Sequence, residues 1–291
     1  FCGHSERIAA LAVSANGSTA ATATVRLDTP ILIWDVSTLQ VRAQCNITWP
    51  ESETTVHIVQ ALSFTPDAAT LVCCFRIGVR GSGVATWDTR TGSCTAHFIS
   101  AEMDLRCAVA INMGCVAYSP RLVHRWVFSP PSRTLVRCAV EPVPVPSDEE
   151  VTITPQLGDF CSIAATPEGD RVVLGTTDGS LVVYERGKDG STLALQSILV
   201  DAHMHCIVAT LIESKSALSS SPVLWSGDSS GVLMRWELPI QNIAEGAVVV
   251  FEAHAEGGGP VSIGCVAASV VPAARVGEGS KAALQDDSES V

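Results

Sequence analysis

The stretch PILIWDV, residues 30–36, ends an apolar run with Trp34 and Asp35 side by side. The same skeleton returns in GVATWDTRTG, residues 83–92, where Trp87 and Asp88 hold the equivalent places. Looser forms follow in RLVHRWVF, in DGSLVVYE and in SSGVLMRWE, which carry Trp126, Tyr184 and Trp236. Self-similarity of this kind identifies a repeat architecture, so the Trp-Asp pair is a structural mark rather than a solitary site of chemistry.

Each repeat has the same internal order of strands and turns. The first unit contains RIAALAV, the turn SANG, STAATAT and ILIW, and the second contains HIVQALSF, the turn TPDA, TLVCCF and GVATW. The fourth has FCSIAA, TPEGD, RVVLGT and SLVVY. β-Branched residues dominate these runs and no long stretch has helical periodicity. The pattern predicts an almost entirely β chain with repeats somewhat longer than the ~40–45 residues of a four-stranded blade, the excess lying in loops.

The Gly3-His4 pair before the first strand, followed by Trp34-Asp35, resembles the signature of WD-repeat β-propellers. Ala202-His203 and Ala253-His254 stand where other repeats would carry Gly-His. The wording and order of GHSERIAALAVSANGSTAATA, GDSSGVLMRWE and AHAEGGGPVSIGC are most similar to the echinoderm microtubule-associated-protein-like group and related cilia- and flagella-associated WD-repeat proteins. The third unit matches this pattern poorly.

The resemblance implies a partial propeller, with five blades and the first strand of a sixth. We expect units at about 1–50, 51–100, 101–141, 156–200 and 201–252, and the start of the next at 253–269. The missing blades are expected from the rest of a longer chain, because an open arc exposes sheet edges. Residues 270–291 are acidic and rich in Ser and Gly, which predicts a flexible segment.

The same resemblance assigns structural roles inside each blade. The third-strand aromatic is expected to fill the space against the next blade. In the family, the His of Gly-His, a second-strand Ser or Thr, a turn Asp and the Trp form a buried hydrogen-bonded chain. The fourth unit has Thr176 and Asp178 without a Gly-His, and the fifth has His203, Ser226 and Trp236 with Ser230 where the Asp belongs. No unit therefore matches the four-residue pattern in full.

Composition excludes several functional classes. The 291 residues carry a formal net charge of -12, which argues against nucleic acid as the main partner. No apolar run reaches the ~20 residues needed to cross a bilayer, so no membrane insertion is expected. The eleven cysteines are odd in number and contain no C-x-x-C pair. They read as free thiols of a protein in the cytoplasm.

Candidate chemical sites have simpler structural interpretations. His203 and His205 share a strand face beside Cys206, which is half of a metal site, but the blade-start role already explains His203. The Asp178-Gly179 and Asp228-Ser229 pairs suit ordinary hairpin turns. The glycine-rich GDSSG, residues 227–231, and GVRGSG, residues 78–83, precede no helix that could hold a phosphate. We expect no catalytic residues, no metal and no cofactor.

The sequence therefore predicts a non-enzymatic protein-interaction scaffold, and the family resemblance implies a microtubule-associated or axonemal one in the cytoskeleton, cilium or flagellum. Tubulin and this chain are both acidic, so attachment would use local patches, neighbouring domains or other axonemal proteins. The alternative is a WD-repeat adaptor that recognises peptide motifs in ubiquitin ligation, trafficking or signalling. The acidic loop SDEE, residues 147–150, is a solvated segment or a docking and phosphorylation site.

Overall fold

The structure is a computed structural model that describes residues 3–25, 29–46, 57–78, 81–129, 132–144, 157–213, 221–240 and 247–252. In these ranges the chain forms twenty strands and no helix. It thus contains no helix of the length and apolarity needed to span a bilayer in the part described. The predictions for His254, for the loop 147–150, for the sixth unit and for the tail 270–291 all fall outside the described residues.

The strands form five antiparallel four-stranded sheets, here called blades 1 to 5. Blade 1 contains β1 (Ile8–Val13), β2 (Thr19–Thr24), β3 (Ile31–Asp35) and β4 (Gln40–Cys45). Blade 2 contains β5 (His57–Phe64), β6 (Thr70–Ile77), β7 (Gly81–Asp88) and β8 (Cys94–Ser100). Blade 3 contains β9 (Cys107–Ile111), β10 (Gly114–Tyr118), β11 (Val123–Ser129) and β12 (Thr134–Cys138). Blade 4 contains β13 (Phe160–Ala165), β14 (Arg171–Thr176), β15 (Leu181–Arg186) and β16 (Leu193–Leu199). Blade 5 contains β17 (Ile207–Glu213), β18 (Val223–Asp228), β19 (Val232–Glu237) and β20 (Ala247–Glu252).

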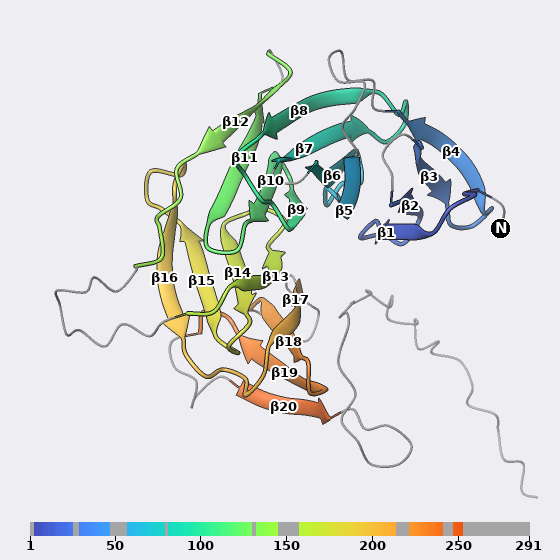
Figure 1. The fold of residues 1–291 in the computed structure, drawn as a ribbon. Helices are drawn as coiled ribbons and strands as arrows, with labels where there is room; N and C mark the ends of the chain where they lie inside the picture. The colour runs from blue at the N-terminus through green and yellow to red at the C-terminus, as the bar shows by residue number, and fades with distance from the viewer. Residues whose placement is uncertain are drawn as a thin grey trace, which may run out of the picture.

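The blades stand side by side along an arc, in chain order (Figure 1). Their first strands, β1, β5, β9, β13 and β17, contact one another in succession and line the inner side of the arc. Among the described strands no comparable contact joins blade 5 back to blade 1. In its described ranges the chain is therefore all-β, with five blades in a β-propeller arrangement, as the repeats predict.

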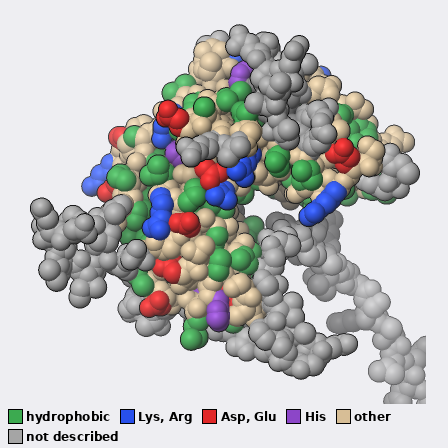
Figure 2. Space-filling view, viewed as in Figure 1, with side chains coloured by type: hydrophobic (Ala, Val, Ile, Leu, Met, Phe, Trp, Pro, Cys, Tyr) green, Lys and Arg blue, Asp and Glu red, His purple; other side chains and the backbone are tan. Residues whose placement is uncertain are grey.

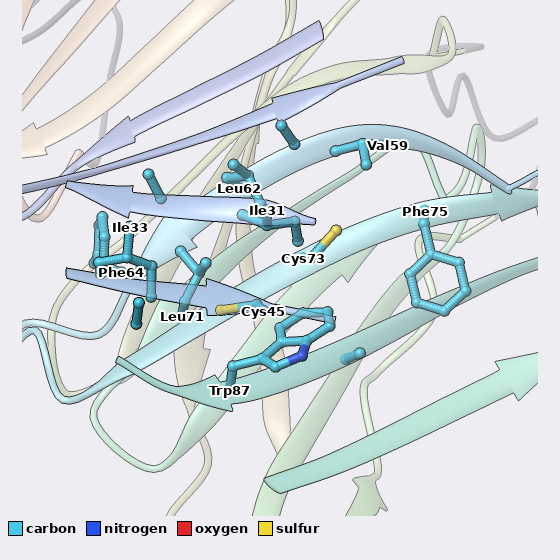
Figure 3. Close-up of a cluster of buried hydrophobic side chains, with 14 residues drawn as sticks. Ile31, Ile33, Cys45, Val59, Leu62, Phe64, Leu71, Cys73, Phe75 and Trp87 are labelled. Carbon is cyan, nitrogen blue, oxygen red and sulfur yellow. The ribbon is translucent and has the colours of Figure 1, made fainter. Parts of the chain in front are cut away.

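Four hydrophobic clusters hold the blades together, one at each junction. Figure 3 shows the cluster between blades 1 and 2, in which Ile31 and Ile33 of β3 meet Leu71, Cys73 and Trp87 of blade 2. Because side chains alternate along a strand, neighbouring residues serve different junctions. Cys73 belongs to this cluster, whereas Cys74 belongs to the cluster between blades 2 and 3. Each inner blade is thus buried on both faces.

The third-strand aromatics pack in the opposite direction to the one predicted. Trp87, Trp126, Tyr184 and Trp236 each join the cluster that their blade shares with the preceding blade, not with the next one. The alternation of β3 explains this direction in blade 1. Ile31 and Ile33 face blade 2, so Trp34 faces the other way. The expectation of packing against the next blade was wrong. The repeat pattern identifies the aromatic residue, but it does not show which face of the sheet its side chain lies on.

Four of the five innermost strands share a second feature, an extra residue in the strand, whereas β9 pairs with β10 in continuous register. The register of pairing with the second strand shifts in β1, β5, β13 and β17, and the residues at the shift are Ala9, Gln60, Cys161 and Val208. Such a bulge leaves one residue unpaired and re-aims its side chain. The side chains at the four bulges therefore do not follow the regular alternation of their strands.

Candidate functional site

The residues singled out as blade marks lie at equivalent places in the structure. Trp34, Trp87, Trp126, Tyr184 and Trp236 all lie on the third strand of their blade and are buried. Trp34 is covered in part by the N-terminal segment, since a Cβ added to Gly3 would lie 2.2 Å from its ring. Trp87, Trp126, Tyr184 and Trp236 are the largest side chains of the four junction clusters. Burial leaves all five aromatics no surface for a partner.

Blade 5 contains a complete hydrogen-bonded chain of four side chains. Trp236 Nε1 donates to Ser226 Oγ over 2.8 Å, and His203 Nε2 lies 2.7 Å from the same oxygen. His203 Nδ1 lies 3.0 Å from Asp228 Oδ2. Asp228 therefore occupies the role for which the family pattern points to residue 230. Ser230 instead donates its backbone N–H and hydroxyl to Asp228 Oδ1, at 2.9 and 2.7 Å.

The prediction that no blade has the complete chain was thus wrong for blade 5. A carboxylate two residues earlier reaches the same histidine, because β18 ends at Asp228 and the turn begins there. Spacing within one repeat could not show this, since the contact depends on how the turn folds back over His203.

The protonation states follow from the surroundings. Burial lowers the pKa of His203 and outweighs the opposing effect of Asp228, so the imidazole is neutral at neutral pH. Burial alone would raise the pKa of Asp228, but hydrogen bonds from Ser230, Val232 and His203 overcome it and lower that pKa. A carboxylate can only accept, so Nδ1 of His203 carries the proton. Donation consequently runs in one direction, from Trp236 through Ser226 and His203 to Asp228.

The order Ser226, His203, Asp228 is the same as in the Ser-His-Asp triad that activates serine in hydrolases. In blade 5, however, these side chains have a structural role. The Ser226 side chain is inaccessible, with 0% exposure, and its oxygen already accepts the indole N–H of Trp236. A nucleophile needs an approach path for substrate, which this oxygen lacks. The chain satisfies four buried polar groups at once and fixes the blade-start loop onto strands β18 and β19.

The other blades keep less of this chain. In blade 1, His4 Nε2 and Trp34 Nε1 each lie 2.7 Å from Thr22 Oγ1. By strand register, the positions that match Thr22 and Ser226 are Cys73 in blade 2, Ala117 in blade 3 and Leu174 in blade 4. Trp87 Nε1 and Trp126 Nε1 are accordingly buried without a hydrogen-bond partner in the described part of the chain. Blades 2 to 4 depend on packing instead.

The predicted aspartates sit in turns. Asp35 Oδ1 accepts from the backbone N–H groups of Ser37 and Thr38, each over 3.0 Å. Asp88 repeats this arrangement in blade 2 with the amides of Arg90 and Thr91. Asp178 accepts from the hydroxyl of Thr176 but meets no histidine in an interaction that the structure records. These carboxylates cap turns between strands.

Blade 3 has a buried histidine of a different kind. His124 of β11 stacks on Trp126 and lies 3.2 Å from both Ser119 Oγ and an Arg137 nitrogen. Burial, followed by the nearby Arg137 charge, lowers the pKa of His124 to about 4. Since the guanidinium can only donate, Nδ1 of His124 accepts and Nε2 carries the proton. Nothing in the repeat pattern predicted this residue.

The candidate metal and phosphate sites do not gain ligands. Both ring nitrogens of His203 are occupied, and the described residues contain no group of three or more His, Cys, Asp or Glu that could hold a metal ion. The glycine-rich stretch 227–231 forms the end of β18 and the tight turn to β19, with Gly231 at positive φ. Its Asp228 carboxylate points into the blade toward His203.

A groove at the outer side of blades 3 and 4 is the candidate interaction site. It has a volume of about 410 Å³. Its lining includes Arg121, Leu122, Val123, Arg137, Cys138, Ala139, Val140, Glu141, Pro142, Val143 and Tyr184. Arg121 forms an exposed 2.8 Å ion pair with Asp159, and Leu122 is half exposed beside it. The groove therefore combines apolar walls with two guanidinium groups and one carboxylate, which suits a peptide segment.

Comparisons with known proteins define the fold. No protein-family model matches the chain, and no curated protein matches its sequence. Among solved structures, it is similar to the β-propeller domain of Cps50 (Swd1) from Myceliophteria thermophila, with a TM-score of 0.57 and 15% sequence identity. The match covers 81% of this chain and 67% of that one. The likeness shows that the chain has a β-propeller fold, and it says nothing about the microtubule-associated group.

Proposed function

We propose that this chain is a non-enzymatic scaffold that binds proteins through a groove and loops held by rigid blades. The groove between blades 3 and 4 carries the proposal, because it is a preformed concave surface on a tightly packed junction. Propellers expose loops and edges around a core that resists distortion, an arrangement suited to display. Basic, acidic and apolar side chains are interspersed on the face seen in Figure 2, as on a surface that selects partners locally.

The chemistry of the groove favours a peptide with apolar and acidic side chains. Leu122, Val140 and Val143 offer apolar contacts, while Arg121 and Arg137 outnumber Glu141. An acidic residue of a partner could exchange for Asp159 on Arg121, since exposed ion pairs contribute little stability. Local positive charge of this kind is compatible with a chain whose overall charge is -12.

A binding measurement tests the groove. Replacement of Leu122 with Glu should weaken binding of acidic-apolar peptides, measured by fluorescence polarisation over a synthetic panel, at least tenfold. Met204, which is 94% exposed and does not line the groove, offers a matched control when it is also replaced with Glu. Equal affinities of the two variants for every peptide that wild type binds would refute groove recognition. Peptide binding at the groove would favour the adaptor alternative in ubiquitin ligation, trafficking or signalling.

The more specific part of the proposal is a microtubule-associated or axonemal role, in the cytoskeleton, cilium or flagellum. Its support is the sequence resemblance of residues 3–23, 227–237 and 253–265 to the echinoderm microtubule-associated-protein-like group. Co-sedimentation with assembled microtubules tests it, in cell extract and with purified tubulin. If the protein stays in the supernatant in both conditions, the microtubule role fails and the general scaffold role stands.

A further inference from the structure

Two thiols from neighbouring blades meet at the inner side of the arc. Cys161 lies in β13 of blade 4, and Cys206 immediately precedes β17 of blade 5. Their Sγ atoms are 3.5 Å apart, although the residues are separated by 45 positions in sequence. Both are free thiols and both are partly exposed. Strands β13 and β17 are in extended contact, so the pair sits at a firmly built junction.

The bulge in β13 is the reason that Cys161 faces blade 5. Cys161 is the extra residue between the pairs Phe160–Thr176 and Ser162–Gly175, so its side chain is released from the regular alternation. The thiol lies 3.0 Å from the backbone oxygen of Ile207, the residue after Cys206. The corresponding bulges of the other inner strands carry Ala9, Gln60 and Val208, so in the described blades only this one presents a thiol.

We propose that Cys161 and Cys206 form a reversible disulfide that links blade 4 covalently to blade 5. The sulfur atoms must approach by about 1.5 Å to reach the bond length of a disulfide, a shift that small side-chain rotations can supply. Hydrogen bonds of Cys161 and Ser162 to the Ile207 oxygen already hold the two strands in place. The bond therefore forms without a rearrangement of the blades.

A small-molecule disulfide, RSSR, serves as the oxidant. Cys206 attacks it, forms a mixed disulfide and releases one RSH. Cys161 then attacks the Cys206 sulfur, gives up its proton and releases a second RSH. The two protein thiols are oxidised and RSSR is reduced to two thiols. Burial, followed by the hydrogen bond to Cys206, raises the pKa of Cys161, which disfavours its thiolate as the first nucleophile.

The cross-link would restrain the separation of two blades that packing and a few hydrogen bonds otherwise join. The inner strands are where the wedge-shaped blades approach one another most closely, so a bond there limits hinge-like opening of the junction. Reduction removes the restraint without changing the surface of the groove, because neither cysteine lines it. The redox state of the surroundings would thus set the rigidity of one end of the arc.

Thiol counting and peptide mapping test the proposal. The full chain is treated with oxidised glutathione or with reductant, quenched in acid, unfolded and alkylated. The reduced chain should label at all eleven cysteines, and the oxidised chain at two fewer. Proteolysis without reductant should release one linked pair of peptides that contains Cys161 and Cys206, lighter by two hydrogen atoms than the separate peptides. The thermal midpoint of the oxidised chain should be several degrees higher and should return on reduction.

Single replacements with serine complete the experiment. Variants C161S and C206S should lose no pair of thiols on oxidation, whereas C94S, at an exposed position, should lose the same two as wild type. Bonds between other cysteines, links between two chains, or a mixed glutathione adduct as the final product would each overturn the proposal. The peptide map of wild type decides the question even if one variant fails to fold.

Discussion

Replacement of Ser226 with Ala isolates the contribution of the hydrogen-bonded chain in blade 5. The change removes one oxygen that is the partner of Trp236 Nε1 at 2.8 Å and of His203 Nε2 at 2.7 Å. Both groups stay buried after the change, so both lose their partner. A buried polar group without a partner costs about 1–3 kcal/mol. We expect the free energy of unfolding to fall by about 2–4 kcal/mol in total.

Ser180 provides a matched control for this change. Its side chain is also fully buried, with 0% exposure, but its Oγ has no hydrogen-bond partner among the residues that the structure describes. Ser180→Ala removes the same atom from an equally dry site and should leave stability unchanged or raise it slightly. Urea unfolding followed by tryptophan fluorescence measures both variants. Equal losses for S226A and S180A would show that the small cavity, rather than the hydrogen bonds, sets the cost, and would refute the reasoning.

Three further outcomes follow from the packing and the charges. The folded-state pKa of His124, about 4, lies below its ordinary value of 6.5, so its contribution to stability is complete above pH 6.5 and is lost as pH falls toward 4. The free energy of unfolding should fall by about 3 kcal/mol over this range. The variant H124Q should flatten the pH dependence of stability measured by urea unfolding, and a pH dependence equal to that of wild type would contradict the role of His124. Trp34→Ala should lower the free energy of unfolding by about 3–5 kcal/mol through the cavity it leaves, and Asp35→Ala should lower it less. Thermal melts with near-equal midpoints for W34A and wild type would refute the packing role of Trp34. Gly92→Ala places a Cβ 2.3 Å from the backbone oxygen of Gln44 and should cost about 1–3 kcal/mol more than Gly17→Ala, because the two glycines have φ of +70° and +69° but only Gly17 faces open space. Equal thermal midpoints of these two variants would contradict the clash.

The blade positions could be predicted from sequence because each repeat has a large aromatic residue at the same place. Trp34, Trp87, Trp126, Tyr184 and Trp236 end similar apolar strands, and this recurrence is enough to count five blades. The inner three strands of a blade also carry clear apolar patterns. The fourth strands are harder to recognise, since β4 exposes four of its six residues and lacks a continuous pattern.

The partners of these residues could not be predicted, because they depend on contacts through space. Asp228 replaces residue 230 only once the turn folds over His203. Cys161 and Cys206 are 45 residues apart and meet because a bulge turns one of them. The groove at blades 3 and 4 is lined by residues as far apart in sequence as Arg121 and Tyr184. The spacing of residues within one repeat contains no information about any of these contacts.

The direction of aromatic packing has a consequence for biosynthesis. Trp87, Trp126, Tyr184 and Trp236 all face the blade that precedes theirs in the chain. When synthesis proceeds from the N-terminus, each new blade that leaves the ribosome finds the surface that covers its aromatic side chain already made. Growth of the arc can therefore keep pace with translation, one blade at a time, and none of these four aromatic side chains has to wait for later sequence. Trp34 is the exception among the described blades, and the N-terminal segment at Gly3 covers its ring from the start.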